Sequence, residues 1–358
     1  MSLPPKDSLR SRLANRLLRW VANTENTGGD YFTTFHRRPK RLAQIGTWPE
    51  PDCTSAGCAI VMQGPVATQD DFTLETLRLY RRNMPQAQLI LSTWKDENAA
   101  ILARIADLGV QVVQSDKPAV PGLFNINMQI VSAGAGVRHA VAQGASWIMK
   151  TRTDQRLYEP NVIPFLIGLA DTFPITGPDL GATAQSKRII GVGHGSLKFA
   201  PYHLTDQTVF GTAQDMLAYW TPPLQDSDLV KRWPSDREQV YLTNAIGALS
   251  QEAVAESYLA SHFLMRMGRK LDWTIADSWR AYRDHFCVAD YGTTDFYWVK
   301  SQTYTRREMN KTYDHVTNRQ ELSFLEWILL HSGQLPTDSA KRYAPVLEKT
   351  FMDNVSQI

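Results

Sequence analysis

The sequence predicts an α/β protein with a mostly parallel central sheet. From Cys58 on, short apolar runs of strand length alternate with longer segments whose apolar residues recur at helical spacing. The first run, Ala59 to Gln63, ends in Gly64-Pro65, which suits a buried strand followed by a tight turn. Strands that alternate with helices predict βαβ units, and βαβ units build parallel sheets.

The elements can be placed in order along the chain, although the alternation weakens past Asp154. Strands are expected at 59–63, 89–94, 110–113, 147–150, 188–193 and 207–211. Helices are expected at 69–84, 96–108, 126–143, 212–220, 236–249 and 252–268, with a helical tail over 305–333 and 338–354. The elements divide the chain into a basic N-terminal helix with its linker (1–50), one α/β domain (51–300) and a C-terminal helical extension (301–358).

The N-terminal segment predicts a basic amphipathic helix over residues 6–21. Leu9, Leu13 and Leu17 share one face of this helix, and arginines occupy much of the rest. Helices of this composition lie on anionic membrane surfaces, but the same apolar stripe could dock on the protein's own core, and both interpretations stay open. The basic run at 36–41 is either a solvated loop or a second contact with anionic lipids.

Composition and charge narrow the class of protein. The formal net charge of +2 lacks the strongly basic character of a nucleic-acid-binding protein. No apolar run approaches the length that spans a bilayer, and basic residues interrupt the apolar positions near the N-terminus. We therefore expect a cytoplasmic protein, peripheral on the inner face of the plasma membrane. The three cysteines cannot form a disulfide framework and are expected to be reduced thiols.

Several common enzyme signatures are absent from the sequence. It lacks the Gly-rich fingerprints of dinucleotide oxidoreductases and P-loop NTPases, the GxSxG of α/β-hydrolases and the HExxH of zinc peptidases. These absences argue against those four classes.

The segment from Lys150 to Arg156 is the strongest candidate for binding chemistry. An apolar strand opens directly into a run that holds the cations Lys150, Arg152 and Arg156 and the carboxylate of Asp154. Because ligands bind beyond the carboxyl ends of parallel strands, this run lies where a ligand is expected. A diphosphate there needs a metal held by carboxylates or direct neutralisation by Arg and Lys. The plain alternative is a solvated charge run.

Four blocks between Ile60 and Arg156 carry a family resemblance. They read IVMQGPV (60–66), LSTW (91–94), NINMQ (125–129) and KTRTDQR (150–156), with weaker similarity in YHLTDQTVFG (202–211) and EQVYL (238–242). Together they resemble the WavE-type lipopolysaccharide-synthesis family. The resemblance implies a glycosyltransferase with a GT-A-like single Rossmann-type domain. It also implies a nucleotide-sugar donor, a UDP-sugar by expectation, and a glycan or lipid-linked glycan acceptor.

The same resemblance implies a divalent metal, Mn²⁺ or Mg²⁺, bound to an Asp-x-Asp motif after the fourth strand. Here the two positions are Arg152 and Asp154, so a guanidinium replaces one carboxylate. We expect the metal to bind Asp154, with His285 as a candidate for completing its coordination shell. Neutralisation of the diphosphate by Arg152 itself, and a structural role for His285, are the alternatives.

The implied donor site draws on the ends of the first four strands and on the start of one helix. Gln63 and Gly64 would read the base and ribose, Asp116 could hold a ribose hydroxyl, and a helix N-terminus could attract the phosphates. Each residue also has a plain structural alternative as a turn former or a helix cap. The candidate donor-binding residues are Gln63, Gly64, Pro65, Thr93, Trp94, Asp116, Asn125, Asn127, Gln129, Lys150 and Arg152.

An inverting transfer to an acceptor hydroxyl needs a general base. The candidates are Asp206, in the block HLTDQTVFG, and Asp236 and Glu238, near the start of an expected helix. Ser235 and Glu238 also have the spacing of a capping box, which explains Glu238 without catalysis. Asp206 could instead grip the donor or acceptor sugar.

Two functions remain open from the sequence. The first is a glycosyltransferase that builds a lipopolysaccharide or capsule type of surface glycan. The second is a catalytically weak or inactive partner of the same fold in a polysaccharide assembly complex. Arg152 favours the second, whereas the retention of Lys150, Asp154, Asp206 and Glu238 favours the first. A nucleotidylyltransferase is disfavoured, because no basic Gly-rich loop follows the first strand.

Overall fold

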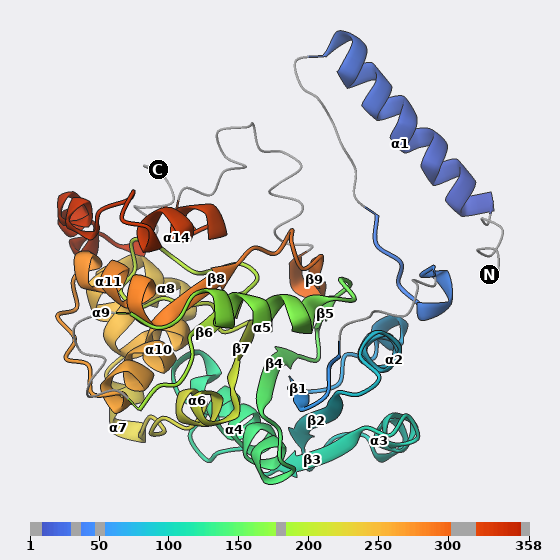
Figure 1. Ribbon diagram of the computed structural model, residues 1–358, viewed down its shortest axis with the longest axis horizontal. Helices are drawn as coiled ribbons and strands as arrows, with labels where there is room; N and C mark the ends of the chain where they lie inside the picture. Colours follow the sequence, from blue (N-terminus) through green and yellow to red (C-terminus); the bar gives the residue numbers. More distant parts are fainter. Residues whose placement is uncertain (1–8, 30–36, 47–53, 177–183, 302–319, 352–358) are drawn as a thin grey trace.

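A computed structural model describes residues 9–29, 37–46, 54–176, 184–301 and 320–351, and Figure 1 shows how their elements are arranged. The central strands are β1 (Cys58–Gln63), β2 (Gln88–Trp94), β3 (Gln111–Ser115), β4 (Trp147–Arg152), β6 (Ile189–Val192), β7 (Thr208–Thr212) and β8 (Phe286–Ala289). They form one sheet in the order β3-β2-β1-β4-β7-β6-β8. β7 runs antiparallel to both of its neighbours, and the other six strands share one direction. The predicted α/β class with a mostly parallel sheet is confirmed.

A second, two-stranded sheet lies just past the end of β4. It pairs β5 (Gln155–Leu157) with β9 (Phe296–Trp298) in antiparallel register. The turn between β4 and β5 consists of Thr153 and Asp154. The pairing therefore brings the chain near residue 298 to the strand end that carries Asp154.

Helices surround the sheet. They are α2 (Phe72–Asn83), α3 (Ala99–Ala106), α4 (Ile126–Ala142), α5 (Val162–Thr172), α6 (Ala213–Tyr219), α7 (Ser227–Lys231), α8 (Arg237–Thr243), α9 (Ile246–Ala248), α10 (Ala255–Arg266), α11 (Ile275–His285) and α14 (Phe324–His331). Short 3₁₀ or π turns are η1 (Leu42–Gln44), η2 (Gln69–Asp71), η3 (Leu123–Asn125), η4 (Leu249–Ala253), η5 (Val299–Ser301) and η6 (Thr337–Glu348). Among these, α5, α7, α11 and the strands β5, β8 and β9 were not predicted.

Helix α4 packs unusually close to the sheet. A Cβ atom added at Gly136 would lie 2.9 Å from Cβ of Ser92 and would also overlap Val61, and one added at Gly134 would lie 2.9 Å from the carbonyl oxygen of Trp220. Small residues on this face of α4 therefore let its backbone approach β1, β2 and α6. The helix start, which lies at the carboxyl edge of the sheet, is fixed by this packing.

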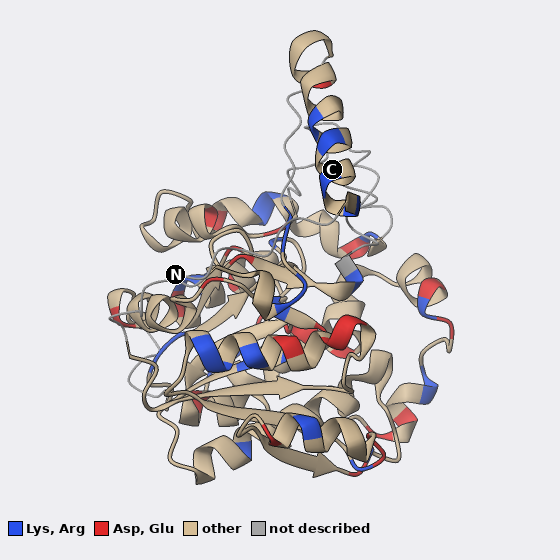
Figure 2. Ribbon diagram, turned by 90° about the vertical axis from the view of Figure 1, so that its right-hand side faces the viewer, with Lys and Arg blue, Asp and Glu red and all other residues tan. Residues whose placement is uncertain are grey.

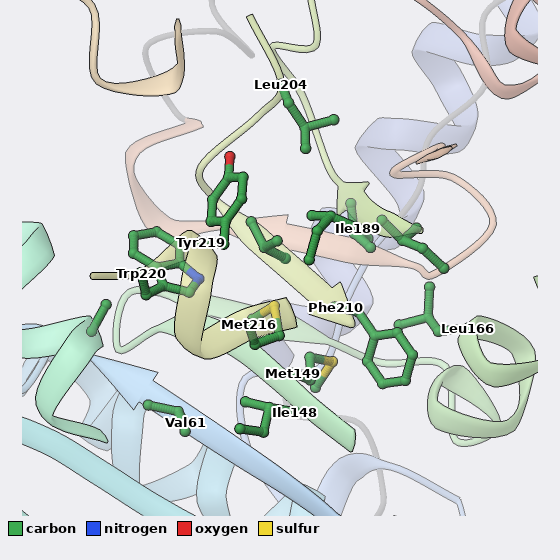
Figure 3. Close-up of a cluster of buried hydrophobic side chains, with 14 of the residues drawn as sticks. Val61, Ile148, Met149, Leu166, Ile189, Leu204, Phe210, Met216, Tyr219 and Trp220 are labelled. Atoms are coloured by element: carbon green, nitrogen blue, oxygen red, sulfur yellow. The ribbon is translucent and has the colours of Figure 1, made fainter. Parts of the chain in front are cut away.

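The main hydrophobic core lies around the junction of β4, β7 and β6, and Figure 3 shows part of it. Trp147 stacks on Phe210 with ring centroids 5.3 Å apart. The C-terminal extension belongs to the same core, because Trp327 of α14 is fully buried and its indole donates to the carbonyl oxygens of Tyr282 and Phe286. The part of the predicted tail that the structure describes is helical, whereas 302–319 and 352–358 lie outside the described residues.

The predicted N-terminal helix is present as α1 (Leu9–Gly28), and it projects from the body of the molecule in Figures 1 and 2. None of its residues is buried, and Trp20 is 67% exposed. The interpretation of this helix as one docked on the core is therefore wrong. Among the described residues, no helix combines the length and the apolar character needed to cross a membrane.

A linker connects α1 to the body. Arg156 of β5 is buried, and its guanidinium donates to the carbonyl oxygens of Pro39 (3.3 Å) and Lys40 (2.8 Å). Arg38 forms an ion pair of 2.6 Å with Asp295. The linker is thus attached to β5 and to the turn before β9, on the side of the molecule where β4 ends.

Candidate functional site

The candidate site is the edge of the sheet where the six parallel strands end. β7 begins at this edge, because it runs in the opposite direction. The reversal between β4 and β7 places the loop before β7 directly beside the end of β4. Ligands of open α/β sheets bind at such edges, where the strand order or direction changes.

Lys150 is the buried support of this site. Its side chain is fully buried, its ammonium donates to the carbonyl oxygen of Asp206 (2.7 Å), and it lies 4.2 Å from the ring centre of Trp220. Burial lowers the pKa of Lys150 to about 7, against the opposing effect of Asp206. The prediction that Lys150 contacts the donor is wrong in this structure, because the side chain is covered. Lys150 instead fixes the position of Asp206.

Arg152 and Asp154 form a two-point ion pair. Nε and Nη2 of Arg152 donate to the two carboxylate oxygens of Asp154 at 2.9 and 3.1 Å. Nζ of Lys300, which follows β9, lies 3.3 Å from Oδ2 of the same carboxylate. Burial alone would raise the pKa of Asp154, but Arg152 and Lys300 outweigh burial and lower it to about 2. The carboxylate of Asp154 is thus fully ionised and shared by two cations.

The predicted metal pair of Asp154 and His285 is not formed. His285 precedes β8 and therefore lies at the opposite, amino-terminal edge of the sheet. There it is buried, and its ring contacts Gln185 and Arg269. Its role is structural, which was the alternative. Within the described part of the chain, no three His, Cys, Asp or Glu side chains come together as a metal-binding group.

Two carboxylates, those of Asp206 and Glu256, lie near enough to Lys150 to act on its charge. Asp206 is buried, and Glu256, in the first turn of α10, is 28% exposed. Burial and then the charge of Asp206 raise the pKa of Glu256, while nearby His203 lowers it. Nδ1 of His203 donates to the carbonyl oxygen of Gly195 (2.8 Å), and Nε2 faces Glu256 at 3.9 Å. A half-buried carboxylate with a raised pKa is typical of a general base.

Glu256 was missed by the sequence reasoning. The helix over 252–268 was expected, and a carboxylate in its first turn could be read as a favourable interaction with the helix dipole. The position of Asp206 was predicted correctly at the start of a strand. The signal that would have joined Asp206 to Glu256 is the antiparallel direction of β7, which the sequence pattern does not reveal.

The other two base candidates lie at the start of α8. The cap of this helix is Asp236, whose carboxylate accepts a hydrogen bond from the backbone N–H of Glu238 (2.9 Å). Ser235 is therefore not the cap, and the capping box predicted from Ser235 to Glu238 is wrong. Glu238 is exposed. Arg237 between them lies 5.0 Å from the ring centre of Phe124 and acts on the charge of Glu256. The start of α8 therefore borders the site, but its carboxylates do not join the acidic pair.

The loop after β1 lies at the same edge of the sheet, beside the β4–β5 turn. Gln63 is buried, and the oxygen of its side-chain amide has no partner among the described residues. Gly64 adopts a φ of 120°, which glycine tolerates and other residues rarely do. The hydroxyl of Thr153 donates to the carbonyl oxygen of Pro65 (2.5 Å), so the loop is fixed to the β4–β5 turn. The unpartnered amide of Gln63 is consistent with its predicted role in reading a base.

The ends of β2 and β3 contribute less than predicted. The hydroxyl of Thr93 is 3.2 Å from Glu97, and Trp94 is buried. Asp116 is exposed and forms an ion pair of 2.6 Å with Lys95. Of these residues, Asp116 is the one whose side chain is open to a ligand.

The candidate residues at the start of α4 differ in burial: Asn127 is buried, whereas Asn125 is exposed. Asn127 is buried and fully bonded, since its amide donates to the carbonyl oxygens of Val120 and Gln225 and accepts from the Gln225 N–H. Its predicted contact with phosphate is therefore wrong. Asn125 occupies the cap position with a φ of 67°, is exposed and makes no capping hydrogen bond. The side-chain oxygen of Gln129 has no partner among the described residues.

Comparison with known proteins identifies the family. A model of WavE lipopolysaccharide synthesis proteins matches residues 58–341. The chain belongs to the WavE lipopolysaccharide synthesis family. No curated protein matches it. One matching solved structure, described as mannose-1-phosphate geranyltransferase from Thermus thermophilus, is 15% identical with a TM-score of 0.24, over 40% of this chain and 43% of that chain.

The region shared with the WavE family contains the whole edge just described, from Gln63 at the end of β1 to Lys300 after β9. Helix α1 lies outside the matched region. The family match thus covers the edge but not α1.

Proposed function

We propose that this WavE protein is a GT-A-type glycosyltransferase that moves a sugar from a nucleotide-sugar donor, with a UDP-sugar as first candidate, to a glycan or lipid-linked glycan acceptor. The observation that carries the proposal is the meeting of two charge groups at one sheet edge. The cations Arg152 and Lys300 lie at the end of β4, and the carboxylates of Asp206 and Glu256 lie close enough to act on Arg152 and Lys150.

These two groups match the two requirements of glycosyl transfer. An acceptor hydroxyl forms the new bond to the anomeric carbon, and Glu256 takes the proton of that hydroxyl. The bond between the anomeric carbon and the diphosphate oxygen breaks, and the diphosphate leaves with the electron pair. Negative charge grows on the diphosphate as it leaves, and fixed cations such as Arg152 stabilise that charge.

Glu256 suits the role of base better than Asp206 does. The side chain of Glu256 is partly exposed, whereas Asp206 is buried and its backbone is bonded to Lys150. Burial and then the charge of Asp206 raise the pKa of Glu256, which makes Glu256 a stronger proton acceptor. Asp206 is therefore a positioning and tuning residue in this proposal.

The test is a screen of nucleotide sugars by thermal shift, followed by mass spectrometry of lipopolysaccharide core oligosaccharides incubated with the donors that bind. Glu256→Gln is expected to slow transfer by about 100- to 10,000-fold, the usual contribution of a general base, without losing the donor-induced shift. Glu348→Gln, at an exposed site on η6, is the matched control and should leave transfer unchanged.

Two outcomes would contradict this assignment. Wild-type turnover by a folded Glu256→Gln variant would remove Glu256 from the role of base. A protein that binds a donor but transfers to none of the acceptors would favour the inactive partner in an assembly complex.

The proposal also includes a place of action on the inner face of the plasma membrane. The apolar residues Leu9, Leu13, Leu17 and Trp20 of α1 are all exposed, and arginines share the helix with them. Figure 2 shows these basic segments along the projecting helix. An uncovered apolar stripe beside cations fits an anionic lipid surface. The linker attaches α1 on the side of the molecule where β4 ends, which suits a lipid-linked acceptor.

Vesicle sedimentation tests the membrane part. The protein should sediment with phosphatidylglycerol vesicles at low salt and be released at high salt, because screening weakens contacts between exposed charges. Leu13→Asp combined with Leu17→Asp should abolish sedimentation and leave transfer to a soluble acceptor intact. Binding that survives this double change would show that α1 is not the anchor.

A further inference from the structure

The residues at the end of β4 decide whether a metal or protein cations neutralise the donor diphosphate. This inference rests on the proposed function. A metal on Asp154 would have to replace the guanidinium of Arg152, which occupies both carboxylate oxygens. It would also lie close to Nζ of Lys300, 3.3 Å from Oδ2. Mg²⁺ and Mn²⁺ prefer carboxylate, carbonyl and water oxygens as ligands, and two cations beside the carboxylate repel a third. The residues present therefore do not fit a divalent ion.

Two cations, Arg152 and Lys300, contact the single carboxylate of Asp154, and this arrangement suits an anionic ligand. Asp154 is 15% exposed and lies against Arg152, whereas Lys300 is 62% exposed. Two cations share the carboxylate of Asp154, and the exposed one is the ammonium of Lys300. Arg152 cannot turn freely, because its Nε and Nη2 are fixed by Asp154. Because Asp154 fixes the orientation of this guanidinium, Arg152 loses little conformational freedom when it binds a phosphate.

We propose that Arg152 and Lys300 bind the donor diphosphate directly, that Asp154 is the counter-ion that orients Arg152, and that no divalent metal takes part. Arg152 would hold the diphosphate through planar N–H groups, and Lys300 would approach from the β9 side as a mobile charge. When the bond to the anomeric carbon breaks, the electron pair moves onto a diphosphate oxygen, and these two cations compensate it. Lys300 lies outside every sequence block that pointed to the site.

Calorimetric binding of UDP, GDP, CDP and ADP tests the proposal with a readout other than activity. Each nucleotide is titrated into metal-stripped protein in EDTA, and again with excess Mn²⁺. At least one nucleotide should bind equally well in both conditions. Lys300→Ala should weaken that binding about tenfold, the size of a lost charged contact, and Lys300→Arg should restore most of it.

Asp154→Asn gives results of opposite sign in the two cases. If Asp154 is a counter-ion, its loss leaves the charges of Arg152 and Lys300 in place, and nucleotide binding in EDTA should persist. If Asp154 is a metal ligand, the same change should abolish the Mn²⁺-dependent binding. The matched controls are Asp171→Asn and Lys187→Ala, an ion pair of 2.8 Å at the opposite edge, and neither should change binding.

Nucleotide binding that requires Mn²⁺ and disappears in EDTA would overturn the inference and leave the proposed glycosyl transfer intact. If no nucleotide binds in either condition, both the inference and the proposed function fail. Because Lys300 is exposed, its variants test the inference even if Asp154→Asn does not fold.

Discussion

Replacement of Lys150 by Met should change how the stability of the protein depends on pH. Lys150 is fully buried, and burial lowers its pKa from 10.5 to about 7. The unfolded chain thus binds a proton between these two values that the folded chain does not. Under such linkage the free energy of unfolding rises with pH by up to about 1.36 kcal/mol per unit, and the contribution is complete only above the unfolded pKa.

Between about pH 7 and about pH 9, this effect of Lys150 raises the free energy of unfolding of the wild type by about 2 kcal/mol. Lys150→Met has no ammonium to titrate, so the gap between wild type and variant should shift by that amount in favour of wild type at high pH. Urea unfolding followed by circular dichroism at both pH values measures the gap. Leu325→Met, at an exposed apolar residue, serves as the control because it changes no titratable group, and its gap should be independent of pH. Parallel pH dependence of wild type and Lys150→Met would refute the reasoning.

Three further predictions follow from the same contacts. Glu256→Gln should raise the melting temperature at neutral pH, because the raised pKa means that ionised Glu256 destabilises the fold. This gain should vanish below the ordinary glutamate pKa of 4.5, and equal shifts at acid and neutral pH would contradict it. Gly136→Ala should lower the free energy of unfolding by about 1–3 kcal/mol in urea titrations, since its methyl group overlaps Val61 and Ser92. Arg156→Leu should expose the linker at 37–46 to limited proteolysis, because the carbonyl of Lys40 loses the guanidinium donor and that of Pro39 keeps only the hydroxyl of Tyr158.

The sequence was sufficient for the parallel half of the sheet. β1, β2 and β4 are near-continuous apolar runs, as parallel strands covered on both faces must be, and each was placed to within about two residues. The edge where a ligand is expected followed from that alone. Arg152 and Asp154 were correctly placed there. Their mutual ion pair could not be inferred from spacing, because it depends on the turn into β5.

The second half of the site depends on contacts between distant segments. Lys300 reaches Asp154 because β9 pairs with β5, and β9 is too short to give a sequence signal. Glu256 meets Asp206 because β7 runs antiparallel beside β4. His285 and Asp154 both follow polar, charged sequence, yet the direction of β8 puts them at opposite edges. The residue types predicted the candidates, and the pairing and direction of the strands decided which of them lie close together.

The ion pair of Arg152 and Asp154 also bears on the raised pKa of Glu256, which burial and the charge of Asp206 cause. Arg152 interacts electrostatically with Asp206 and Glu256, so a guanidinium that Asp154 did not hold would be attracted to them. Such a contact would lower the pKa of Glu256 and weaken it as a base. Asp154 prevents this by holding Arg152 with two hydrogen bonds on the donor side. In the proposed mechanism, Asp154 thus keeps Arg152, which would bind the diphosphate, apart from Glu256, which would act as the base, and both proposed roles need that separation.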